Sequence, residues 1–123
     1  MVVAVLGVVL LGCLAVFQAL LASGAPLGRF AWGGRHDVLP ARLRIGSGVS
    51  IALYAFFALL LLQSAGAVEV LAAGVADVGI WVLTAYLAIG VVMNAVSRSR
   101  PERLVMTPVA LVLASICVVL ALR

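Results

Sequence analysis

The hydrophobic positions of the chain gather into four long runs, which are separated by short segments containing glycine, proline or charge. The runs cover about residues 2–22, 43–63, 78–95 and 104–122. An α-helix needs roughly 20 apolar residues to cross a bilayer core about 30 Å thick, and each run is about that long. The sequence therefore predicts an all-α fold, an integral membrane bundle of four transmembrane helices, as a single domain over residues 1–123.

The first run raises the alternative of a cleaved signal peptide. Its only strongly polar side chain is Gln18, and the small residues at 22–24 resemble a cleavage site. A positively charged leader is missing, however, and the apolar stretch is longer than that of a signal peptide. A helix that is retained in the mature protein is therefore favoured.

The sequence leaves the outer end of the third helix open. The segment GAVEVLAAGVAD is apolar apart from Glu69 and Asp77, so this helix could begin as early as Ala67. Both carboxylates belong near the outer boundary of the membrane, because an ionisable side chain at mid-bilayer is costly. The second run, which contains ALYAFFALLLL, is the clearest spanning helix.

Arginine supplies all eight basic residues and is concentrated around two of the three connecting segments. The first group comprises Arg29, Arg35, Arg42 and Arg44, and the second comprises Arg98, Arg100 and Arg103. With four helices both groups fall on the same side of the membrane, and short loops rich in basic residues stay in the cytoplasm. The sequence therefore predicts that both termini face out, together with Glu69, Asp77 and Arg123.

The composition excludes a soluble globular domain, since hydrophobic residues make up 67% of the chain and the mean hydropathy is +1.36. The net charge of +4 is compatible with nucleic-acid binding. Arginines at a membrane surface more often orient the protein and contact anionic lipid. The predicted partners are thus membrane lipids with anionic headgroups at the cytoplasmic face, not nucleic acid, and the predicted location is a bacterial cytoplasmic (inner) membrane, crossed several times.

A short motif recurs before the second and fourth helices. PARLRI begins at Pro40 and PERLVM begins at Pro101, so proline, arginine and leucine repeat at half the chain length. One interpretation is a duplicated helical hairpin, as in some transporters. The other is convergence, because proline suits the first turn of any helix and a nearby arginine can extend to the headgroups. Convergence is favoured, since little else aligns.

The segment FAWGGRHDVLPARLR contains the only histidine and could form a site. His36 precedes Asp37, and a histidine beside a carboxylate can act as a general base or a proton relay. Trp32 is typical of a membrane interface, and Gly33 with Gly34 supplies backbone freedom. A tight turn at the membrane surface explains most of the segment and is favoured, so no catalytic residue is predicted. The candidate cytoplasmic loop site comprises Trp32, Arg35, His36, Asp37, Arg42, Arg100 and Arg103.

A second candidate site lies within the membrane. Ser47, Ser50 and Tyr54 are spaced so that they share one helix face. Together with Asp77, at the mouth of the third helix, they form a candidate intramembrane polar path between the second and third helices. Hydrogen bonding between helices is the commoner use of such residues and is favoured. Small multidrug transporters are similar in length and helix number, but they rely on a glutamate inside the first helix, where this chain has only Gln18.

Neither a metal site nor a cofactor is predicted. His36 has no second histidine and no cysteine near enough in the sequence to suggest metal ligation, and neither a nucleophile elbow nor a glycine-rich phosphate motif is present. Cys13 and Cys117 lie inside the first and fourth runs without a C-x-x-C partner. Such thiols usually act as small hydrophobic side chains, and a disulfide would need the two helices to meet at matching depth.

The segments GAPLGRFAWGGRHDVLPARLRIGS and NAVSRSRPERLVMTPVAL, over residues 24–47 and 94–111, resemble an uncharacterised family of small bacterial four-helix integral membrane proteins. The resemblance implies that the two arginine-containing loops are the distinctive parts of the chain. It carries no activity, cofactor or catalytic residue with it. The use of arginine alone as the basic residue, with abundant alanine, valine, leucine and glycine, also suits a GC-rich bacterium.

The leading functional hypothesis is a small non-enzymatic membrane protein, either an accessory subunit or a self-associating helix bundle. Small residues in the helices favour a homo-oligomer or a larger membrane complex; they are Gly7, Ala15, Ala19, Gly46, Gly48 and Gly90. One alternative is a small transporter or channel that uses the polar path. Another is a membrane enzyme acting on a lipid or phosphate-bearing substrate through His36 and an arginine clamp, which requires the two arginine-containing loops to meet in space.

Overall fold

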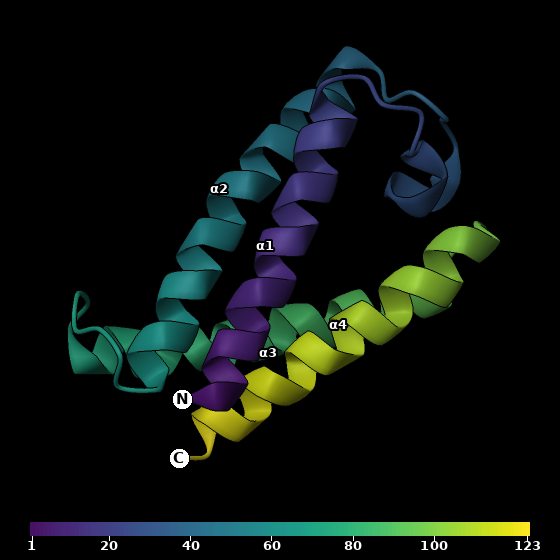
Figure 1. Cartoon of the computed structure of the whole chain (residues 1–123). Coiled ribbons are helices and arrows are strands. Elements are labelled where there is room, and N and C mark those ends of the chain that lie inside the picture. The colour runs from purple at the N-terminus through teal and green to yellow at the C-terminus, as the bar shows by residue number, and fades with distance from the viewer.

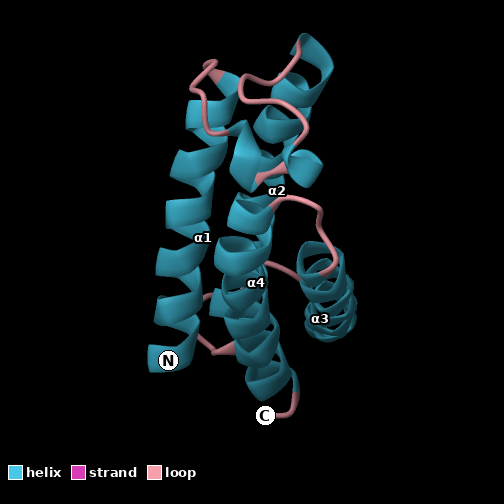
Figure 2. Ribbon diagram, turned by 90° about the vertical axis from the view of Figure 1, so that its right-hand side faces the viewer, coloured by secondary structure: helices cyan, strands magenta, loops and turns pink.

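The computed structural model describes all residues from Met1 to Arg123 and is entirely helical (Figure 2). Its four long helices are α1 (Val2–Ala22), α2 (Ala41–Ser64), α3 (Ala73–Ala95) and α4 (Arg100–Ala121). Two short 3₁₀ helices, η1 (Gly28–Phe30) and η2 (Trp32–Gly34), lie between α1 and α2. All four long helices are long and apolar enough to cross a membrane. The predicted all-α fold with four helices of membrane-spanning length is therefore confirmed.

The second and fourth helices begin slightly before their hydrophobic runs, at Ala41 and Arg100. The start of the third helix, which the sequence left open, lies at Ala73, so α3 contains Asp77. The first turn of α4 is helical although its residues are polar. The side chain of Ser99 caps this turn, and Pro101 occupies an early position that requires no N–H partner. Hydropathy reports the apolar part of a helix, and these ends extend beyond it.

The helices form two antiparallel hairpins, α1 with α2 and α3 with α4, and each hairpin packs most extensively within itself. The hairpins are inclined to each other, and both termini lie at one end of the molecule (Figure 1). The opposite end, called here the arginine end, holds the long loop (residues 23–40) and the short loop (residues 96–99). Hydrogen bonds join the long loop to Ser99 and to Glu102 at the start of α4, so the arginine-containing loops lie at the same end of the molecule.

The tightest packing between the hairpins lies toward the end that holds the termini. All four helices contribute to this buried cluster, which consists of Ala4, Leu11, Leu60, Leu61, Ile80, Leu83, Leu113, Ile116, Cys117 and Leu120. Toward the arginine end the hairpins diverge, and the long loop folds back into the opening between them (Figure 1). The molecule is therefore wedge-shaped, with its apolar contact at one end and a loop-filled opening at the other.

One arginine ties together the helices of each hairpin. Arg44, the fourth residue of α2, donates from Nε to the carbonyl of Ala22, the last residue of α1, at 2.8 Å. Arg103, the fourth residue of α4, donates to the carbonyl of Ser97 just after α3, at 2.9 Å. A cation at a helix C-terminus satisfies carbonyls that lack helical partners and complements the helix dipole.

These clamps bear on the repeated proline motif. Pro40 immediately precedes α2, whereas Pro101 is the second residue of α4. Relative to the start of its helix, the second motif therefore lies two residues later than the first. The clamping arginines, Arg44 and Arg103, occupy the same position in their helices. This difference supports convergence of the motif over a simple duplication.

The loop between α2 and α3 is organised by one side chain, that of Gln63. Its amide nitrogen donates to the carbonyl of Leu71 at 2.6 Å, and its amide oxygen accepts from the backbone N–H groups of Val70 and Leu71 at 3.1 and 2.8 Å. Glu69 remains exposed in this loop. At the end of the bundle opposite the arginines, the loop is thus held by hydrogen bonds to a single side chain.

The packing predicts different effects on stability when either of two glycines of α1 is replaced. A Cβ added at Gly7 would lie 2.7 Å from Leu61 and 3.2 Å from Ile116, whereas at Gly12 it would meet nothing within 4 Å. We expect Gly7→Val to lower the free energy of unfolding by about 1–3 kcal/mol through overpacking, and Gly12→Val to leave it nearly unchanged. Thermal unfolding followed by circular dichroism in detergent measures both, and equal losses would contradict the packing described.

Candidate functional site

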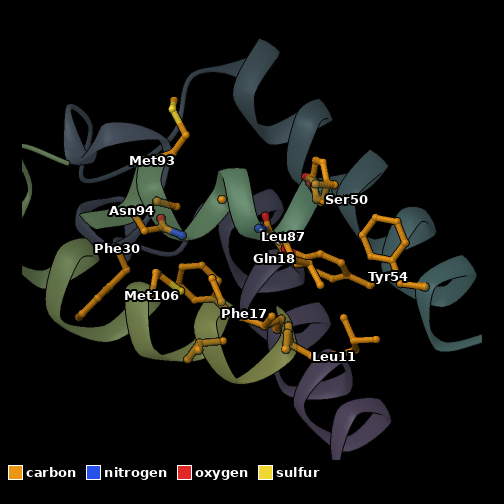
Figure 3. A pocket seen from close by; sticks show the side chains of 18 of the residues that line it. Leu11, Phe17, Gln18, Phe30, Ser50, Tyr54, Leu87, Met93, Asn94 and Met106 are labelled. Carbon is orange, nitrogen blue, oxygen red and sulfur yellow. Dashed lines mark hydrogen bonds between the residues drawn. The ribbon is translucent and has the colours of Figure 1, made fainter. Parts of the chain in front are cut away.

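A cavity of about 440 Å³ lies between the hairpins in the half of the bundle next to the long loop (Figure 3). Every long helix and the long loop contribute to it. The lining residues are Leu11, Leu14, Phe17, Gln18, Phe30, Ala31, Trp32, Ser50, Tyr54, Phe57, Tyr86, Leu87, Ile89, Gly90, Met93, Asn94, Met106, Val109, Ala110 and Leu113. The cavity exists because the hairpins diverge toward this end and no large side chain fills the space.

The lining is mostly apolar, with 16 hydrophobic residues among 20, and contains no carboxylate, arginine or histidine. Its polar groups belong to Gln18, Ser50 and Asn94 and to the hydroxyls of Tyr54 and Tyr86, two residues that are also counted among the 16 hydrophobic ones. Binding sites for small molecules commonly combine an apolar wall with a few polar groups, in volumes of about 300–1,000 Å³. The cavity therefore matches a binding site in size and character.

One hydrogen bond crosses the lining from α1 to α2. Gln18, which is 8% exposed, donates from its amide nitrogen to the hydroxyl of Tyr54 at 3.3 Å. The amide oxygen of Gln18 is buried and has no partner. Ser50 instead bonds within its own helix, to the carbonyl of Gly46 at 3.0 Å. Gln18, a lining residue, thus has one hydrogen-bond acceptor that the protein leaves unused.

Trp32 covers the cavity from the long loop. It is the only residue other than glycine with a positive φ, at 52°, a backbone conformation that costs about 1–2 kcal/mol for a residue with a Cβ. Its indole N–H donates to the hydroxyl of the fully buried Ser47 at 3.4 Å, and the ring lies against Gly46. The sequence indicated an interfacial anchor; in the structure Trp32 also forms part of the cavity wall.

The N-terminus of α4 holds the long loop in place. Ser99 and Glu102 have the spacing of a capping box, in which the serine caps the glutamate N–H and the glutamate normally returns to the serine N–H. Here the Ser99 hydroxyl accepts from Glu102 N–H at 3.5 Å, but the Glu102 carboxylate accepts from the N–H of Gly33 at 3.0 Å. The carboxylate that would normally complete the helix cap therefore binds the long loop instead.

Two further contacts complete this docking. The Ser99 hydroxyl donates to the backbone carbonyl of Arg29. Gly34 lies so close to Ser99, with a φ of 71°, that no side chain could be accommodated at this position. Within the loop, the N–H of Gly28 donates to the carbonyl of Asp37 at 2.9 Å. The long loop is therefore a closed turn seated on α4.

The residues of the predicted loop site occupy different positions at the arginine end. Trp32 lines the cavity, and His36 is half-buried in the long loop. Arg103 is used to clamp the α3–α4 hairpin. The remaining four side chains are exposed; they are Arg35, Asp37, Arg42 and Arg100. The two arginine-containing loops meet, through contacts that involve Gly33, Ser99 and Glu102.

The residues of the predicted intramembrane path are only partly brought together. Ser50 and Tyr54 line the cavity, and Ser47 lies beside it under Trp32. Asp77 is exposed in a shallow surface depression with Trp81, near the start of α3. Cys13 and Cys117 are free, the first exposed and the second buried, and no three residues among His, Cys, Asp and Glu converge on one point.

Sequence reasoning overlooked Ser99 and Glu102. The signal was present, because a serine followed three residues later by glutamate and then by an apolar run marks a helix start. The hydrogen bond between the Glu102 carboxylate and the Gly33 amide could not be predicted from the sequence. It depends on how two segments separated by 69 residues meet in space.

The docking predicts that Glu102→Ala will release the long loop. Losing a hydrogen bond to a charged acceptor costs about 1.5–3 kcal/mol, so trypsin cleavage after the exposed Arg35 should become roughly tenfold faster or more. Glu102→Gln keeps an acceptor and should stay closer to the native rate, and Glu69→Ala in the opposite loop should have no effect. Cleavage that is equally fast in native protein and in Glu102→Ala would show that this bond does not hold the loop.

Comparisons with protein-family models, with curated proteins and with solved structures found no match to this chain.

Proposed function

We propose that this chain is a small non-enzymatic protein of a bacterial cytoplasmic membrane, with the arginine end at the cytoplasmic face and both termini outside. The observation that carries the proposal is the docking of the long loop on the start of α4, through Gly33 and Glu102. It joins the loop regions of the two hairpins, whose connectivity places seven of the eight arginines at one end of four membrane-length helices. Such an asymmetry is what retains loops in the cytoplasm.

The arginines at this end divide into two groups with different roles. Arg44 and Arg103 are half-buried and clamp the hairpins. The other five are exposed; they are Arg29, Arg35, Arg42, Arg98 and Arg100. Basic residues near an anionic membrane surface contribute about 1 kcal/mol each. The exposed group is thus suited to contact anionic headgroups, which we propose as the protein's partners at this face.

The surroundings of the acidic groups support a binding role over catalysis. Glu102, the one buried carboxylate, accepts a backbone N–H bond and belongs to a helix start. Tyrosine, serine and amide side chains supply the polarity of the cavity lining. These residues suit recognition of a neutral ligand, whereas acid–base catalysis generally uses a histidine or carboxylate in contact with the substrate.

Association with a second copy or with a larger membrane complex is part of the same proposal. Gly12, Gly48 and Gly74 face outward with no atom within 4 Å of an added Cβ. In a membrane, small residues at a helix surface allow another helix to approach closely. An accessory subunit or a self-associating bundle would use such surfaces.

Orientation can be tested with single cysteines. In a Cys13→Ser, Cys117→Ala background, Arg35→Cys and Glu69→Cys place a thiol in the loops at opposite ends of the bundle. We expect a membrane-impermeant maleimide to label residue 69 in intact spheroplasts and residue 35 only after the membrane is opened. The reverse pattern would reject the proposed orientation.

Lipid contact can be tested by native mass spectrometry from vesicles that contain equal amounts of phosphatidylglycerol and phosphatidylcholine. We expect the native chain to retain phosphatidylglycerol preferentially. Changing Arg35, Arg98 and Arg100 to glutamine should reduce that preference at least tenfold, since each arginine contributes about 1 kcal/mol.

The matched control is Arg123→Gln, because this arginine lies at the opposite end of the bundle, and it should leave the lipid preference unchanged. Equal loss in both variants, or no preference in the native chain, would reject the proposed lipid contact. The same spectra count the chains in each complex, and a monomer with no associated protein at any concentration would reject association.

A further inference from the structure

Aromatic side chains are concentrated around the cavity. The chain has eight aromatic residues, and six of them line it: Phe17, Phe30, Trp32, Tyr54, Phe57 and Tyr86. They come from α1, α2, α3 and the long loop, so no single helix face accounts for the clustering. The ring of Phe57 lies 6.2 Å from that of Tyr54 and 5.7 Å from that of Tyr86, both in tilted arrangements. Such surroundings favour a flat ring, because aromatic pairs gain about 0.5–1.5 kcal/mol beyond the area they bury.

Two of the three methionines, Met93 and Met106, also line the cavity. Thioethers are polarizable, adapt their shape and make favourable contacts with aromatic rings. An ordinary lipid chain could occupy the same space, but it would use neither the aromatic rings nor the polar groups. The composition of the wall therefore points to a ligand that contains a ring.

Charge on the ligand is disfavoured by the same wall. No arginine, histidine or carboxylate is among the lining residues, and a charge without a partner in an apolar site is strongly penalised. The arginines that lie nearest in the sequence to Trp32, namely Arg29 and Arg35, are exposed and outside the lining. The ligand that fits is neutral.

The polar requirement comes from Gln18 and Tyr54. The hydroxyl of Tyr54 accepts from the Gln18 amide, which leaves its own proton to be donated. The amide oxygen of Gln18 has no donor, and rotating the amide by half a turn only leaves the nitrogen unpaired instead. A hydroxyl group on a ligand can accept from one of these residues and donate to the other, and it would satisfy both.

We propose that the cavity binds a neutral, ring-containing amphiphile that carries a hydroxyl group, of the phenol or hydroquinone class. The ring lies among the aromatic side chains of α1, α2 and α3, and the hydroxyl lies between Gln18 and Tyr54 (Figure 3). The long loop, with Trp32 in the wall, separates this ligand from the cytoplasmic surface. This site is independent of the headgroup contacts proposed above, because it uses none of the exposed arginines.

The test compares matched probes of one size with the native chain in detergent, at neutral pH and by isothermal titration calorimetry. 1-Naphthol can donate and accept a hydrogen bond, 1-methoxynaphthalene can only accept, 1-methylnaphthalene can do neither, and 1-naphthoate is charged. We expect naphthol to bind about tenfold more tightly than methylnaphthalene, with methoxynaphthalene between them and naphthoate not bound. That ratio corresponds to one or two hydrogen bonds in a buried site.

Partition of each probe into the detergent is measured with the variant Ala110→Phe, in which a ring from α4 fills the cavity. This background is subtracted from the binding measured with the native chain. Gln18→Leu and Tyr54→Phe should each reduce the naphthol preference to about threefold or less. The two substitutions act on different helices, and circular dichroism monitors whether each variant is folded. Ser115→Ala is the control, because this exposed residue of α4 lies outside the lining, and it should keep the full preference.

Equal affinities of the native chain for naphthol and methylnaphthalene would overturn the proposal. A full naphthol preference in both Gln18→Leu and Tyr54→Phe would overturn it as well, and so would binding to Ala110→Phe that matches the native chain. If methoxynaphthalene binds as tightly as naphthol, the hydroxyl assignment is rejected. None of these outcomes depends on the lipid preference or on the orientation of the chain.

Discussion

The hydrogen bond from the Gly33 amide to the Glu102 carboxylate is the contact on which the arginine end depends. Without it, the long loop would have no charged acceptor on the other hairpin and would be held there by the Ser99–Arg29 hydrogen bond. Because Glu102 is buried and also belongs to the capped start of α4, one residue fixes both a helix end and a loop. The position of Trp32 in the cavity wall follows from this anchoring.

The cavity is a consequence of how the two hairpins share their contacts. Each hairpin is closed by its own arginine clamp and by packing along its length. The hairpins then meet mainly through the buried cluster near the termini, where Gly7 of α1 lets Ile116 of α4 approach closely. Since the two hairpins are inclined to each other and meet at one end, space remains at the arginine end. The chain fills part of that space with the long loop and lines the rest with aromatic residues.

Much of the fold could be predicted from the sequence, because the information lies in local runs. Hydropathy locates four helices, and the arginines place two loops together. The cavity could not be predicted, since a helix that is apolar on every side does not reveal which face points inward. Gln18 illustrates the point: it is conspicuous in the sequence, but its partner Tyr54 emerges only when α1 and α2 are paired. Conversely, Asp77 is equally conspicuous and lies on the surface, away from the cavity.

The docking of the long loop also sets an order of events during biosynthesis. Gly33 is followed by 69 further steps along the chain before Glu102 is reached, so α1 and α2 are complete long before their loop has its partner. Until then the Gly33 amide and the aromatic lining contributed by α1, α2 and the long loop lack their partners on α4. The first hairpin is therefore synthesised before its loop can dock, and only the synthesis of α4 supplies the docking partner.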